Sequence, residues 1–213
     1  MTNRSGPLRV KICGVTRVID AVLAADAGAD MIGLNFVEGS PRRVDLRTAR
    51  EIAERVRGQV ELVGVVADED DARLVELQRD VGLDWLQLHG DEPPERVQAL
   101  LPRAFKAVRV GSADDASRAM AYPGEILLVD ARVEGQLGGT GVCVDPALVV
   151  ALAGARRVML AGGLKPDNVA EAVRAVGPWG VDTASGVESA PGIKDPGKVT
   201  AFIAAARQAV SAS

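Results

Sequence analysis

The feature that most constrains this chain is a regular alternation of two kinds of segment. Short apolar runs rich in β-branched residues are each followed by a longer amphipathic segment, and eight such pairs follow one another. Alternating strands and helices predict a parallel sheet covered by helices. The strands are expected at Leu8–Cys13, Met31–Phe36, Val60–Ala67, Asp84–His89, Ala104–Val110, Ile126–Asp130, Arg157–Ala161 and Gly180–Ala184. The helices are expected at Arg17–Ala27, Leu46–Arg57, Asp70–Val81, Pro93–Leu101, Ala113–Ala121, Asp145–Ala153, Pro166–Ala175 and Pro196–Val210.

Eight units without a linker or a change in composition favour closure of the sheet into a single-domain (β/α)8 (TIM) barrel that spans residues 1–213. The rival fold is an open, doubly wound sheet, which commonly carries the fingerprint G-x-G-x-x-G after its first strand. Here the first strand ends in Cys13-Gly14-Val15-Thr16, without that fingerprint. We therefore predict the α/β barrel.

Composition narrows the class of partner. A net charge of -4 gives no basic face for nucleic acid, and no run of about 18 apolar residues predicts a membrane span. The two cysteines, Cys13 and Cys143, cannot form a disulfide framework of the secreted type, which favours a reducing, cytoplasmic setting. Cys143 is expected to be structural, the commonest role of a free cysteine. With one histidine in the chain, we expect no metal and no cofactor. The expected partner is a small molecule, bound by a monomer or a homodimer.

Polar side chains gather at the carboxyl ends of the predicted strands. The side chains of a strand alternate between its two faces. If the apolar Ile32 and Leu34 face the helices, Asn35 faces the barrel interior. The same argument places five residues on the interior side: Cys13, Asn35, His89, Asp130 and Asp182. Enzymes with this fold keep their chemistry at that end of the barrel, so we expect Asn35 and His89 to contact a substrate.

Three of these residues carry groups that exchange protons. Cys13 is either a small buried side chain or a base whose thiol is made acidic by a nearby cation such as Lys11. Asp130 follows an apolar strand and is either a cap for the next turn or a general acid or base. Asp182 is expected to orient a substrate hydroxyl or to pair with Lys11.

Glycines follow the seventh and eighth strands, at Gly162-Gly163 and at Ser185-Gly186. Glycine lets the backbone approach an anion closely, and the loops after these two strands commonly form the phosphate site of such barrels. We therefore expect Gly162, Gly163, Ser185 and Gly186 to bind a phosphate.

The remaining polar candidates have two interpretations each. Arg42 and Arg43, in the loop after the second strand, are either solvated or available to hold a carboxylate in a bidentate fork. His89 is either a base or a buried structural histidine beside Gln87. The acidic run Asp68–Asp71 resembles a metal site but is expected to cap the third helix.

Several stretches of the chain, taken in order, resemble the phosphoribosylanthranilate isomerase family. The matching stretches are Val10–Thr16, Ser40–Arg42, Gln87–Gly90, Asp130 with Gly138–Gly141, Leu160–Leu164 and Val181–Glu188. The resemblance implies an Amadori rearrangement of N-(5-phosphoribosyl)anthranilate in tryptophan biosynthesis. It implies that Asp130 is the general acid that opens the furanose ring and that Cys13 is the base that removes the C2′ proton.

The resemblance also implies binding roles. Arg42 corresponds to the arginine near the anthranilate carboxylate, Asp182 to a residue near the hydroxyl and amine groups, and the two glycine loops to the phosphate grip. One stretch departs from the family, because Val142–Pro146 stands where the family carries an aromatic-rich segment. The resemblance therefore does not predict the shape of the lid or the start of the sixth helix.

Three other functions stay open at this point. A related sugar isomerase would use paired aspartates without a cysteine, and a metal-dependent epimerase would need several histidines. A catalytically silent protein that binds a phosphorylated ligand is the third. Turnover of the anthranilate substrate distinguishes among them.

Overall fold

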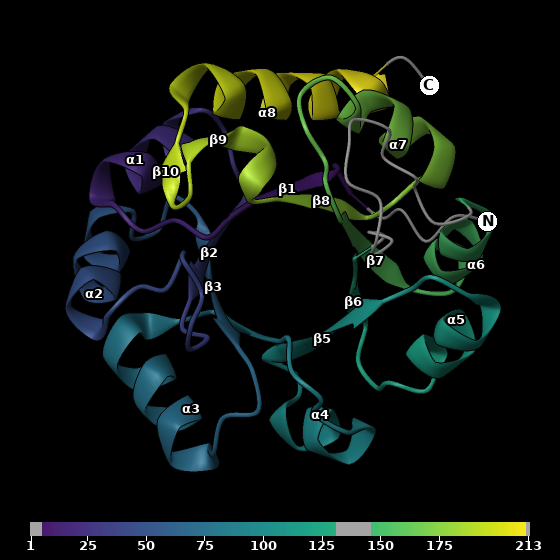
Figure 1. Cartoon of the computed structure of the whole chain (residues 1–213), viewed down its shortest axis with the longest axis horizontal. Helices are drawn as coiled ribbons and strands as arrows, with labels where there is room; N and C mark the ends of the chain where they lie inside the picture. Colours follow the sequence, from purple (N-terminus) through teal and green to yellow (C-terminus); the bar gives the residue numbers. More distant parts are fainter. Residues whose placement is uncertain (1–5, 131–145, 212–213) are drawn as a thin grey trace.

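The computed structural model describes residues 6–130 and 146–211. Within that part, eight parallel strands form a closed barrel in chain order, with β8 hydrogen-bonded back to β1, and a ring of helices surrounds them (Figure 1). The strands are β1 Arg9–Cys13, β2 Met31–Asn35, β3 Glu61–Val66, β4 Trp85–Leu88, β5 Ala104–Arg109, β6 Ile126–Asp130, β7 Arg157–Ala161 and β8 Gly180–Thr183. The helices are α1 Val18–Asp26, α2 Leu46–Arg55, α3 Asp71–Leu77, α4 Pro94–Leu100, α5 Ala113–Met120, α6 Pro146–Ala155, α7 Val169–Val176 and α8 Pro196–Ser211. The predicted (β/α)8 barrel is confirmed.

Apolar side chains form two separate cores. The larger lies between the strands and the helices and includes Ile32 and Leu34. The smaller fills the barrel interior and includes Met31, Phe105 and Leu128. Alternate residues of β2 to β7 therefore supply the two cores, as the sequence pattern predicts, whereas β1 and β8 contribute to the outer core alone.

An aromatic ring closes the amino-terminal end of the barrel. Trp179 packs against the inner core, and the guanidinium groups of Arg9 and Arg157 lie 5.9 and 6.0 Å from its ring centre. Each geometry is within the range of a cation–π contact. This end is filled by structural side chains, which leaves the carboxyl end for chemistry.

The helix bounds differ from the predicted ones by one or two residues at most ends, and by more in the third and seventh helices. The third ends at Leu77, and the chain continues as a π-helix, η1, over Gln78–Gly82. Asp70 caps α3 by accepting a hydrogen bond from the Arg73 amide, as expected from the acidic run. The seventh begins at Val169 instead of Pro166, because the Asn168 side chain accepts a hydrogen bond from the Lys165 amide and holds these residues in a turn.

The sequence analysis missed three short elements after β8. They are a 3-10 helix, η2, at Ser185–Val187 and an antiparallel hairpin of β9 Glu188–Ala190 with β10 Ile193–Lys194. Strands of two or three residues carry too little alternation to be recognised. The hairpin lies beside β1 and α1 (Figure 1).

The segment 131–145 lies outside the described residues. The expectations for Gly138–Gly141 and for Cys143 fall within it and stay predictions.

Candidate active site

Apart from the exposed Arg43, the residues proposed from the sequence for catalysis and binding line one cavity of about 310 Å³ at the carboxyl end of the barrel. They are Cys13, Asn35, Arg42, His89, Asp130, Gly162, Gly163, Asp182, Ser185 and Gly186. A second cavity of about 550 Å³ lies over β5 and α5 and shares His89 and Asp130 with the first. These two side chains therefore stand where the two cavities meet.

The thiol of Cys13 lies beside a buried ion pair. Lys11 and Asp182 are partners across β1 and β8, and Lys11 Nζ lies 2.8 Å from Asp182 Oδ1. Gly33 makes room for this group, because a Cβ there would lie 2.7 Å from Cys13 Sγ and 3.0 Å from Lys11 Nζ. Of the two interpretations of Asp182, the pairing with Lys11 is thus observed.

Burial and charge act against each other on Cys13 and Lys11. Burial raises the pKa of the Cys13 thiol, and the positive charge of Lys11 opposes this without cancelling it. For Lys11, burial acts to lower the pKa, but the Asp182 carboxylate and Cys13 outweigh it, so the pKa lies above its ordinary value. Lys11 is therefore positively charged beside the thiol. It stabilises the thiolate more than an uncharged residue at this position would.

His89 follows β4 and is held by Gln87, whose Nε2 lies 2.9 Å from His89 Nδ1. Burial, and next the charge of Lys11, lowers the pKa of His89, so the imidazole is neutral at neutral pH. With the Gln87 amide nitrogen as the donor, Nδ1 accepts and Nε2 carries the proton. His89 is thus arranged as a hydrogen-bond donor at the cavity wall.

The loop that carries His89 is fixed by a second buried ion pair. Lys106 Nζ lies 2.8 Å from Glu92 Oε2, and Glu92 Oε1 accepts hydrogen bonds from the amides of Asp68 and Gly90. The Asp68 carboxylate in turn accepts from the Asp91 amide. This network, which was not predicted from the sequence, joins β5 to the loops after β3 and β4.

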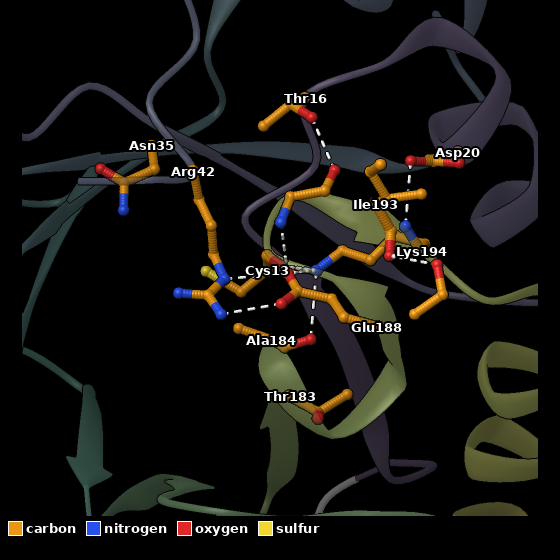
Figure 2. A network of polar contacts seen from close by, with 12 residues as sticks. Cys13, Thr16, Asp20, Asn35, Arg42, Thr183, Ala184, Glu188, Ile193 and Lys194 are labelled. Carbon is orange, nitrogen blue, oxygen red and sulfur yellow. Dashed lines mark hydrogen bonds and ion pairs between the residues drawn. The ribbon is translucent and has the colours of Figure 1, made fainter.

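Arg42 meets a carboxylate of the protein itself. Its Nε and Nη2 lie 2.8 and 2.7 Å from the two carboxylate oxygens of Glu188, in a bidentate pair (Figure 2). Asn35 organises the same loop, since its amide accepts from the Val37 amide and donates to Ser40 Oγ. Arg42 forms a bidentate pair with a carboxylate, as expected. The carboxylate belongs to Glu188, which was not singled out from the sequence.

The two glycine loops are shaped by close packing. Gly162 and Gly163 have φ of 100° and 75°, a region that favours glycine. A Cβ on Gly186 would lie 2.0 Å from the Leu164 carbonyl oxygen, so the loop after β8 packs directly on the loop after β7. The Thr183 hydroxyl donates to the same carbonyl oxygen at 2.8 Å.

The described residues contain neither a metal-binding cluster nor a membrane-spanning helix. Over 6–130 and 146–211, no group of three or more histidine, cysteine, aspartate or glutamate side chains could hold a metal ion. No described helix has the length and apolar character to cross a membrane.

A closed (β/α)8 barrel whose cavity combines a thiol, a carboxylic acid and two glycine loops defines a barrel enzyme of acid–base chemistry. The model of the N-(5'phosphoribosyl)anthranilate (PRA) isomerase family matches residues 10–205. The chain belongs to this family, and the resemblance expected from the sequence is confirmed.

Individual relatives agree with the family match. The chain is 49% identical over 205 residues to the N-(5'-phosphoribosyl)anthranilate isomerase of Myxococcus xanthus, with 94% of this chain and 96% of the relative covered. Its structure is similar to the phosphoribosyl anthranilate isomerase of Thermotoga maritima, with a TM-score of 0.85, 35% identity and 94% and 99% of the chains covered. A similar structure holds reduced 1-(o-carboxyphenylamino)-1-deoxyribulose 5-phosphate, with a TM-score of 0.83, 33% identity and the same coverage.

Proposed function

We propose that the 310 Å³ cavity converts N-(5'-phosphoribosyl)anthranilate into 1-(2-carboxyphenylamino)-1-deoxyribulose 5-phosphate, a step of tryptophan biosynthesis. The observation that carries the proposal is the meeting of Cys13 and Asp130 in one cavity, with Lys11 beside the thiol. An aminal opening followed by a proton shift needs one acid and one base, and these two side chains supply them.

The reaction begins with the acid. Asp130 donates a proton to the furanose ring oxygen, the bond between that oxygen and C1′ breaks, and the nitrogen lone pair forms an iminium. The Cys13 thiolate then removes the proton from C2′, and the electrons of that bond neutralise the iminium to give an enolamine. Tautomerisation to the ketone returns the protons, so the reaction consumes no oxidant and no reductant.

The lysine beside the thiol favours formation of the thiolate. Because burial raises the pKa of Cys13, a thiolate in this position needs a compensating charge. Lys11 supplies part of that compensation, and its pairing with Asp182 keeps the ammonium in place. A free thiol with this role suits a reducing cytoplasm.

The other lining residues bind the substrate. The loops at Gly162-Gly163 and Ser185-Gly186 hold the phosphate through backbone N–H groups, and Arg42 attracts the carboxylate of the aromatic ring. Asn35 shapes the arginine loop. His89 and Asp182 face the sugar, where the imidazole donates through Nε2 and the carboxylate accepts.

A turnover assay tests the function. Purified protein is added to N-(5'-phosphoribosyl)anthranilate, and formation of the ketone product is followed, with growth rescue of a strain lacking this isomerase step as a second readout. Binding of the substrate without turnover would instead indicate a silent phospho-ligand-binding protein. Turnover that persists in both Cys13→Ala and Asp130→Asn would exclude the proposed mechanism.

A further inference from the structure

The Glu188 carboxylate joins two cations at the edge of the cavity, and no step proposed above uses it. Building on the proposed function, we propose that Glu188 is a positioning residue. It fixes the Arg42 guanidinium with its Nη1 side toward the cavity, and so sets the preference for a substrate whose aromatic amine carries a carboxylate.

The first support is the edge of Arg42 that Glu188 occupies. The bidentate pair uses Nε and Nη2, at 2.8 and 2.7 Å, and no hydrogen bond within the described residues uses Nη1. Figure 2 shows one guanidinium nitrogen of Arg42 directed away from Glu188. Because Arg42 lines the substrate cavity, this nitrogen is the donor left for a ligand.

The second support is how firmly Glu188 is itself held. Its side chain is 5% exposed, and Oε1 accepts from Lys194 Nζ at 2.9 Å and from the Gly192 amide at 3.3 Å. Lys194 is fully buried and also donates to the carbonyl oxygens of Cys13 and Ala184, at 2.6 and 3.2 Å. The carboxylate is therefore fixed to the ends of β1 and β8 whether or not a substrate is present.

The third support is the charge of this group. Arg42 and Lys194 share one carboxylate. Burial lowers the pKa of Lys194 and the Glu188 carboxylate opposes this; with both cations protonated, the three side chains together carry a net charge of +1. Burial acts to raise the pKa of Glu188, but hydrogen bonds from both cations outweigh it and hold the pKa below its ordinary value. The group is thus neutralised by a ligand with one carboxylate and left positively charged by a ligand without one.

The fourth support is the path of the arginine side chain. A Cβ on Gly14 would lie 2.6 Å from Arg42 Cδ, so the aliphatic part of the arginine lies directly on the backbone next to Cys13. The Arg42 amide donates to Ser40 Oγ at 3.2 Å. With the stem fixed by packing, the remaining freedom is the rotation of the guanidinium, which a bidentate partner removes.

The test compares two substrates. Wild type, Glu188→Gln, Arg42→Ala and the double variant are assayed with N-(5'-phosphoribosyl)anthranilate and with the carboxylate-free N-(5'-phosphoribosyl)aniline. We expect Glu188→Gln to reduce the ratio of the two kcat/KM values on the order of tenfold, mainly through a higher KM for the carboxylated substrate. The double variant should match Arg42→Ala, because Glu188 acts through the arginine.

A matched control is Glu51→Gln, which removes a carboxylate from the exposed pair with Arg47 and should leave the ratio unchanged. An unchanged ratio in Glu188→Gln, or equal losses for both substrates, would overturn the proposal. If the variant does not fold, Glu188→Asp keeps the charge but shortens the reach to Arg42, and the same ratio decides. Wild type inactive on both substrates would reject the proposed function instead.

Discussion

Lys11 and Asp182 face one another across the seam where β1 meets β8, with Lys11 Nζ 2.8 Å from Asp182 Oδ1 and the Cys13 thiol beside them. The ammonium is fully buried, so its charge is poorly screened and acts strongly on the thiol. The seam of the barrel is thus also the place where the proposed base is activated.

Replacing this lysine should reduce the fraction of Cys13 that is thiolate at neutral pH. In Lys11→Met the pKa of Cys13 rises further, because burial is no longer opposed by the neighbouring cation. We expect the pH dependence of Cys13 alkylation to move to higher pH and kcat to fall at least about tenfold. Lys106→Met is the control for the alkylation profile, since it breaks another buried lysine–carboxylate pair, with Glu92, without touching Cys13. Equal alkylation profiles in wild type and Lys11→Met would contradict the activation.

The proposed acid and base should each be needed for turnover. Cys13→Ala and Asp130→Asn are expected to lower kcat at least about 100-fold, the typical effect of losing an acid or base. Steady-state kinetics and thermal unfolding of the same preparations separate chemistry from stability. A variant with nearly normal kcat would remove its residue from the mechanism.

His89 offers a direct measurement of the electrostatics, because it is the only histidine in the chain. Burial lowers its pKa, so NMR titration should give a value below about 6.5. The unfolded chain then binds more protons than the folded protein, and the free energy of unfolding should fall as the pH drops below about 6.5. His89→Gln should flatten this slope. A histidine pKa above its ordinary value would contradict the arrangement.

The glycine loop after β7 can be tested with a matched pair of substitutions. Gly163 and Gly28 have φ of 75° and 94°, and a Cβ on either would meet no atom within 4 Å. Replacing either glycine with alanine should therefore lower the free energy of unfolding by a similar amount, about 1 kcal/mol, as measured by denaturant unfolding. Only Gly163→Ala should also raise KM for the phosphorylated substrate, because its Cβ enters the phosphate loop. A normal KM in Gly163→Ala would indicate that the phosphate binds at another place.

The alternation of segments was sufficient to predict the barrel and the interior side of each strand end, because both follow from periodicity. Cys13 and Asp130 could be placed in one cavity for the same reason. Glu188 could not be assigned as the partner of Arg42, since 146 residues separate them and a short hairpin brings them together. The network of Glu92 and Lys106 was missed because buried ion pairs leave no periodic signal.

Lys194 has a consequence for biosynthesis. The strand that carries Cys13 leaves the ribosome well before Lys194 is added, yet its last carbonyl oxygen is bound by that lysine, 181 residues later. The closing pair of Lys11 with Asp182 spans 171 residues. While a nascent chain ends before residue 194, the Cys13 carbonyl oxygen therefore lacks its lysine partner, and no fragment that stops before this residue contains the complete proposed site.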